Sequence, residues 1–144
     1  MTNPPPRDLA ERTFLFSCAI VRFCRQLSTE PGIVRQIAWQ LADAGTSVSA
    51  NYEEAKGSYS RREFAAKTSI VLKEAREARL WLRIILACNL AADSDAAHQP
   101  YDESDQLVGI FIASLRKLRQ PQLSPKTVVV TIAAIIGFVW LAVG

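Results

Sequence analysis

Three arginines with helical spacing are the residues of this sequence best suited to bind an anion. Arg76, Arg79 and Arg83 stand at positions i, i+3 and i+7, so a helix carries them on one side. Arginines gathered on one face commonly bind phosphate groups. Glu74 and Glu77 lie among them, and the alternative interpretation is a solvated, partly salt-bridged face. Three more cations near the start of the same predicted helix complete the candidate anion-binding set: Arg61, Arg62 and Lys67.

A second polar set stands about thirty residues earlier. Ser47, Asn51 and Glu54, at i, i+4 and i+7, share one face of a predicted helix, and Gly45 lies close by. These four residues are a candidate surface for a ligand, a partner or another subunit. The alternative is a seam of small and polar residues where a second helix approaches closely and Asn51 fixes the register.

The residues that catalysis or metal binding requires are missing from the sequence. His98 is the only histidine, so neither a Glu-x-x-His di-iron pair nor a catalytic triad can form. No glycine-rich phosphate loop follows a predicted strand. We therefore predict no enzymatic activity, no metal, no cofactor and no small-molecule substrate. Five carboxylates lie close together without the spacing of a calcium loop: Asp93, Asp95, Asp102, Glu103 and Asp105.

Charge and cysteine content narrow the class of protein further. The chain of 144 residues carries a net charge of +3, and the acidic stretch from 93 to 105 contains no lysine or arginine. The rest of the chain is therefore more basic than the net charge suggests. Such a charge is expected of a protein that binds a polyanion or an anionic membrane. Cys18, Cys24 and Cys88 lie in apolar helical patterns, which predicts reduced thiols in the core of a cytosolic domain.

Apolar residues recur with alternating steps of three and four, which predicts amphipathic helices. The first helix begins after Asp8, with Phe14, Val21 and Cys24 widening its buried stripe. The second runs from about Ile33 to Lys56, and the third follows a capping box from Ser60 to Glu63. After a long acidic loop at 93–104, the fourth spans about 105–119. Short connections then predict an all-α, antiparallel, up-down-up-down four-helix bundle over 8–120, preceded by a disordered segment at 1–7.

An uncharged apolar segment follows a linker at 121–126. Eighteen residues, 127–144, rise about 27 Å as a helix, close to the thickness of a bilayer core. Positive residues precede the segment and none follows it, so we expect the bundle in the cytoplasm and the tail in the membrane. The alternatives are a buried helix in the centre of an oligomer and a cytoplasmic protein. Four residues represent the predicted membrane segment: Thr127, Ile132, Phe138 and Trp140.

One stretch carries more than helical periodicity. The run GTSVSANYEEA at 45–55 leads into Ser60, Glu63, Phe64 and Lys67, and then into Glu77 and Trp81-Leu82. This order resembles the bacterial four-helix-bundle family named for proteins encoded in 23S rRNA intervening sequences. Val48 replaces the usual isoleucine, and the tail after Pro121 lies outside the family pattern. The resemblance implies a bundle that forms homopentamers.

The resemblance also suggests a type of partner. Similar proteins that accompany the reverse transcriptases of diversity-generating retroelements bind the polymerase and nucleic acid. We therefore expect a non-enzymatic, oligomeric interaction or scaffold protein, with nucleic acid or a partner protein as its target, tethered to a membrane by its C-terminal helix. The alternative is a purely structural membrane-associated assembly without nucleic-acid binding.

Overall fold

Side-chain caps start the first and the third helix where the sequence predicts them. In the computed structural model, Asp8 accepts a hydrogen bond from Ala10 N at 3.0 Å, which caps the first helix. Ser60 accepts one from Glu63 N at 3.1 Å. The Glu63 carboxylate accepts from Tyr59 N and pairs with Lys67, each at 3.1 Å. The Lys67 and Tyr59 contacts together lower the pKa of Glu63.

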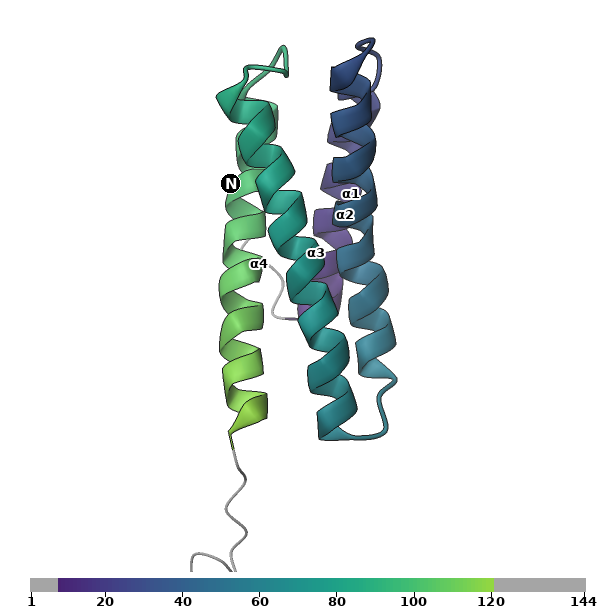
Figure 1. The fold of residues 1–144 in the computed structure, drawn as a ribbon, viewed down its shortest axis with the longest axis vertical. Helices are drawn as coiled ribbons and strands as arrows, with labels where there is room; N and C mark the ends of the chain where they lie inside the picture. Colours follow the sequence, from purple (N-terminus) through teal and green to yellow (C-terminus); the bar gives the residue numbers. More distant parts are fainter. Residues whose placement is uncertain (1–7, 121–144) are drawn as a thin grey trace, which may run out of the picture.

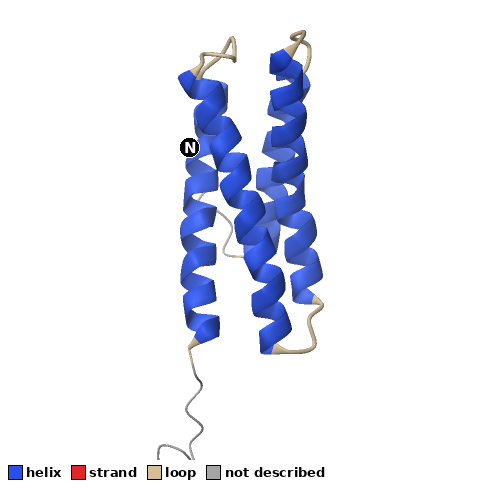
Figure 2. Ribbon diagram, viewed as in Figure 1, coloured by secondary structure: helices blue, strands red, loops and turns tan. Residues whose placement is uncertain are grey.

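The structure describes residues 8–120, which form four helices and no strand (Figures 1 and 2). The helices are α1 (Leu9–Leu27), α2 (Ile33–Lys56), α3 (Arg61–Ala87) and α4 (Asp95–Arg119). They run alternately up and down, which confirms the predicted antiparallel bundle. None of these helices combines the length and apolarity that crossing a bilayer needs. The predictions for 1–7, 121–126 and 127–144 lie outside the described residues.

The core is formed by the predicted stripes. Ile20, Leu41, Leu82 and Phe111 are fully buried at its centre. The helices pack in the order α1, α2, α3, α4 around the bundle, and the α1–α4 edge has the sparsest contact. Burial of these stripes is the main stabilising term, at about 25 cal/mol per Å² of apolar surface withdrawn from water.

Two residues assigned to the α1 stripe lie on the outside instead. Phe14 is 54% exposed and Val21 is 49% exposed, whereas Cys24 is buried as predicted. Phe14 is rotated by about 100° around the helix from the buried Thr13, because each residue advances a helix by that angle. An apolar residue next to a stripe is therefore not automatically inside it.

The cysteines divide into three environments. Cys24 is buried, and loss of solvation raises the pKa of its thiol to about 12. Cys18 is half-buried on the outer side of α1. Cys88 is exposed just after α3 ends. The prediction of three core thiols is therefore confirmed for Cys24 and wrong for Cys18 and Cys88.

The fourth helix begins ten residues earlier than predicted, at Asp95. Most of the predicted acidic loop is therefore helical, including His98 and Pro100. Ala97, Pro100 and Ser104 are buried, because they extend the α4 stripe by further turns. Asp93 accepts hydrogen bonds from Asp95 N and Ala96 N, a favourable place for a carboxylate at a helix N-terminus.

Gly45 sets the close approach of α1 and α2. A Cβ at this position would lie 2.6 Å from Ile20 Cγ2, well inside van der Waals contact. Ser17 Oγ donates to Gly45 O at 2.7 Å and lies 2.8 Å from Ser49 Oγ, so the two backbones are tied together at this level. Only glycine allows the fully buried Ile20 to occupy this place.

We expect Gly45→Ala to lower the free energy of unfolding relative to Gly109→Ala by about 1–3 kcal/mol, the usual cost of overpacking a core. Both substitutions remove a helical glycine, but a Cβ at Gly109 meets nothing within 4 Å. Gly109→Ala alone should stabilise the protein by roughly 0.5–1 kcal/mol. Urea titration followed by circular dichroism measures both, and equal effects would refute the close approach.

A charged contact holds the α1–α4 edge. Arg12 Nε lies 2.6 Å from Glu103 Oε1 and Arg12 Nη2 lies 3.0 Å from Glu103 Oε2, with a further hydrogen bond to Gln106. Both side chains are largely buried, with 12% and 26% exposed. The hydrogen bond to Glu103 raises the pKa of Arg12. This bidentate pair joins two helices that otherwise touch little.

We expect Glu103→Gln to reduce the free energy of unfolding by about 1–2 kcal/mol, because the pair loses one charge while the Arg12 side chain stays largely buried. Glu53→Gln is the matched control, since its pair with Lys56 is exposed on the surface. Surface pairs of this kind contribute little, so the control should unfold like the unaltered chain. Thermal and urea unfolding distinguish the two variants.

Candidate functional site

A basic groove runs along the junction of α3 and α4. Its upper part, of about 430 Å³, is lined by Lys73, Arg76 and Arg116 around Ser69 and Ile112. It continues into a hollow of about 550 Å³ that shares Ser69 and Arg119 with it. No carboxylate lines either part. We use the name basic groove for this surface and its six cations: Arg61, Arg62, Lys73, Arg76, Arg116 and Arg119.

The antiparallel topology brings these cations together. In Figure 1 the start of α3 and the end of α4 lie at the same end of the bundle. Arg116 and Arg119 belong to the last turns of α4, where positive side chains interact favourably with the helix dipole. Arg61 donates to the carbonyls of Lys117 at 2.6 Å and Leu118 at 3.0 Å, so it also caps α4.

The predicted arginine stripe on α3 does not act as one unit. Arg76 lines the groove, but Arg79 is paired with Asp105 of α4 and its charge is compensated. Arg83 is exposed and lies outside the groove lining. Lys67 belongs to the other side of α3, where it pairs with Glu63 and lies 3.4 Å from Glu54 O.

The groove therefore combines predicted and unpredicted residues. Arg61, Arg62 and Arg76 belong to the candidate anion-binding set predicted from the sequence. Lys73, Arg116 and Arg119 do not belong to that set. Lys73 lies 3.5 Å from Glu74, but the Lys73 side chain is 73% exposed, so this contact is weak. The predicted antiparallel order could have found these residues. In an antiparallel pair the start of one helix lies beside the end of the next, so the α4 arginines had to lie near the first turns of α3.

The polar set on α2 is divided between two sides of the helix. Gly45 is buried against α1, so it cannot contact another subunit in this fold. Ser47 and Asn51 are half-buried, and Asn51 Nδ2 donates to Ser47 O at 2.8 Å within the helix. Glu54 is exposed. These contacts fit a seam of small and polar residues better than one continuous binding surface.

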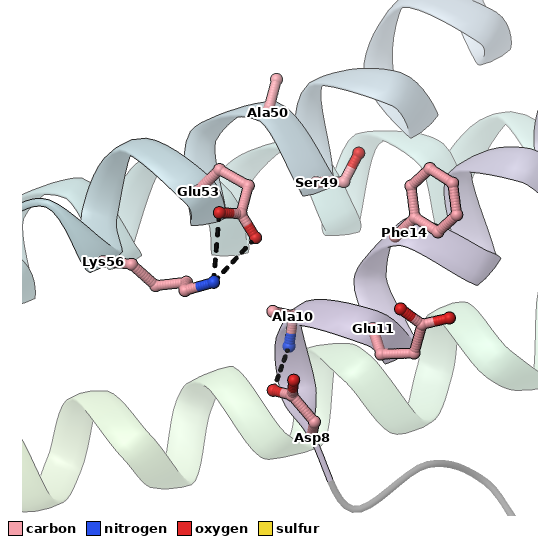
Figure 3. Close-up of a pocket in the computed structure, with 8 residues that line it drawn as sticks. All are labelled: Asp8, Ala10, Glu11, Phe14, Ser49, Ala50, Glu53 and Lys56. Carbon is pink, nitrogen blue, oxygen red and sulfur yellow. Dashed lines mark hydrogen bonds and ion pairs between the residues drawn. The ribbon is translucent and has the colours of Figure 1, made fainter.

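An acidic hollow of about 450 Å³ lies between the start of α1 and the end of α2 (Figure 3). Asp8, Glu11 and Glu53 line it with Phe14, and Lys56 is its one cation. Lys56 Nζ lies 3.1 Å from both oxygens of Glu53, and this hydrogen bond raises the pKa of Lys56. The bundle thus carries opposite charge on different outer faces. Across residues 8–120, no three His, Cys, Asp or Glu side chains gather as a metal site would require.

Comparison with known proteins agrees with this architecture. The chain is similar to a crystal structure of a protein with unknown function from the S23 ribosomal protein family of Bacteroides thetaiotaomicron, with 24% identity and a TM-score of 0.67. The match covers 75% of this chain and 98% of that one, and it supports the fold alone. No curated protein matches the sequence. The 23S rRNA-intervening sequence protein family matches residues 8–111, and the chain belongs to this family.

Proposed function

We propose that this protein is a non-enzymatic interaction protein whose basic groove binds the phosphate backbone of nucleic acid. The observation that carries the proposal is the groove itself, in which six cations of α3 and α4 meet with no lining carboxylate. A polyanion neutralises such a surface and releases its own counterions, which is the main source of affinity in sequence-independent binding.

The shape and composition of the groove favour an extended polyanion over a small one. The two hollows join through Ser69 and Arg119 into one open channel along the helices. Apart from the cations and Ser69, its lining is mainly aliphatic, and no aromatic ring is available for stacking a base. Contacts limited to phosphates position a nucleic acid without reading its sequence, so we propose binding with little sequence preference.

Self-association and membrane tethering are the other two parts of the proposal. Several copies in one assembly multiply a modest basic groove, and the family resemblance implies a homopentamer. Residues 127–144, uncharged throughout, supply the proposed tether and keep the bundle in the cytoplasm. The second candidate is a structural membrane assembly, favoured by the position of Arg116 and Arg119 just before the apolar segment, where they can contact anionic headgroups.

We expect the full chain to bind single-stranded RNA or DNA, with an affinity that falls steeply between about 50 and about 200 mM salt. Arg76→Gln should lower the slope of log K against log salt by about 1, because one phosphate contact is lost. Arg83→Gln is the matched control: it removes an exposed arginine two turns further along α3, outside the groove. Fluorescence anisotropy with a labelled oligonucleotide measures the slope. Absence of binding at low salt would remove the nucleic-acid proposal.

We expect the full chain to fractionate with membranes and a chain lacking 127–144 to stay in the supernatant. Circular dichroism of the shortened chain provides the folding control. Resistance of the full chain to alkaline carbonate extraction identifies an inserted segment. A contrary outcome is that the shortened chain sediments with anionic vesicles and is released from them by the double substitution Arg116→Gln, Arg119→Gln. In that outcome the structural membrane assembly replaces nucleic-acid binding as the proposed function. A full chain that remains in the supernatant would exclude the tether.

A further inference from the structure

The turn between α2 and α3 carries the most exposed aromatic side chain of residues 8–120. Tyr59 is 99% exposed, whereas Tyr52 and Tyr101 are packed against the core. The backbone of this turn serves the fold, because Tyr59 N donates to the Glu63 carboxylate. The next residue, Ser60, caps α3. A turn of fixed shape therefore holds the Tyr59 ring away from the bundle.

The same turn lies beside the end of α4. Arg61 Nη2 donates to Lys117 O at 2.6 Å, and Arg61 Nε donates to Leu118 O at 3.0 Å. In Figure 1 the turn and the end of α4 lie at the same, lower end of the bundle. Gln120 is the last described residue after α4. The proposed membrane segment, 127–144, begins seven residues after it.

Positive side chains surround this end of the bundle. Arg62 is exposed, and it forms no ion pair within residues 8–120. The last turn of α4 adds three further cations. We use the name basic end for the turn at 57–60 and the cations beside it: Arg61, Arg62, Arg116, Lys117 and Arg119.

The carboxylates of the neighbouring segments do not cancel this charge. Residues 53–67 and 116–119 together contain seven cations and three carboxylates. Two of those carboxylates, Glu53 and Glu63, are paired with lysines. Asp8 and Glu11 belong to the start of α1, which Figure 1 shows set back from the basic end. This fits the lengths of the helices, since α1 has 19 residues and α3 has 27, a difference of about 12 Å.

We propose that the basic end docks on an anionic lipid bilayer, with the Tyr59 ring among the headgroups and Arg62 against their phosphates. Tyrosine is enriched at membrane–water interfaces, because its ring is apolar and its hydroxyl group remains hydrated. Basic residues near the surface add an attraction that falls off within a Debye length. The inference rests on the proposed membrane tether and adds a second, separate contact to it.

Docking at this end sets the direction of the bundle. The long axis of α3 then points away from the bilayer, and the turns at 28–32 and 88–94 lie at the far end. Arg76 is fourteen residues from Arg62, about 21 Å further along α3. That distance exceeds the Debye length of about 8 Å at physiological ionic strength. The upper part of the basic groove therefore stays available to nucleic acid, while its lower cations face the headgroups.

A fluorescent label at position 59 of the full chain tests the contact. The probe chain carries Tyr59→Cys together with Cys18→Ser and Cys88→Ser. Its remaining thiol, Cys24, is buried and stays unlabelled. The control chain carries only Cys18→Ser and is labelled at the exposed Cys88, just after the far end of α3.

Both labelled chains are reconstituted into vesicles of phosphatidylcholine and phosphatidylglycerol. A spin label on the lipid headgroups quenches any dye that reaches them. We expect quenching at position 59 and none at position 88, because the two positions lie at opposite ends of α3. In vesicles of phosphatidylcholine alone the quenching at position 59 should weaken, because the anionic headgroups are missing.

A charge substitution in the probe chain distinguishes docking from mere closeness to the tether. Arg62→Gln should lower the ratio of docked to free bundles about fivefold, because one basic residue near the anionic surface is lost. Arg83→Gln is the matched control, since it removes an exposed arginine twenty-one residues further along α3. The same quenching measurement reports both, and circular dichroism checks that each variant is folded. Equal quenching in the two variants would overturn the proposal.

The outcomes also separate docking from the tether. A full chain that floats with the vesicles but is not quenched at position 59 ends the docking proposal and keeps the tether. Equal quenching at positions 59 and 88 also overturns docking, because the bundle then lies along the membrane. A full chain that does not float with vesicles ends both. Nucleic-acid binding is measured without membranes, so none of these results affects it.

Discussion

Burial of four apolar stripes against one another is the constraint on which the rest of this structure depends. Leu41 and Phe111, far apart in the sequence, are both fully withdrawn from water, and each helix contributes one buried side. Because those sides face inward, everything that can recognise a partner must lie on the outer faces or in the grooves between helices. The bundle is thus a scaffold, and its function depends on the surfaces it displays.

Polar contacts refine this arrangement at the helix junctions. Arg12 joins α1 to α4 through Glu103, Arg79 joins α3 to α4 through Asp105, and Arg61 caps the end of α4. These arginines serve the fold, so they contribute less than their number suggests to any attraction for anions. Within residues 8–120, four of the cations that form no ion pair gather beside α4 in the basic groove: Arg62, Arg76, Arg116 and Arg119.

Two outer surfaces of opposite character result. The α3/α4 side presents the basic groove, while the α1/α2 side presents the exposed Phe14, Val21 and Trp39 and the acidic hollow. A groove of one sign suits a ligand that is itself a polyanion.

The sequence by itself determined the helices, most of the core and the antiparallel order. Apolar residues that recur at steps of three and four indicate amphipathic helices, and short turns between such helices make neighbours antiparallel. The sequence placed Ile20 and Leu82 inside correctly, and the cap at Asp8 correctly. Only the tertiary structure decided the start of α4, since burial of Pro100 against the core outweighs its poor fit to a helix. Packing likewise decided that Arg76 and Arg116 line the same groove, because periodicity gives the direction of a side chain around its own helix but not which helix lies beside it.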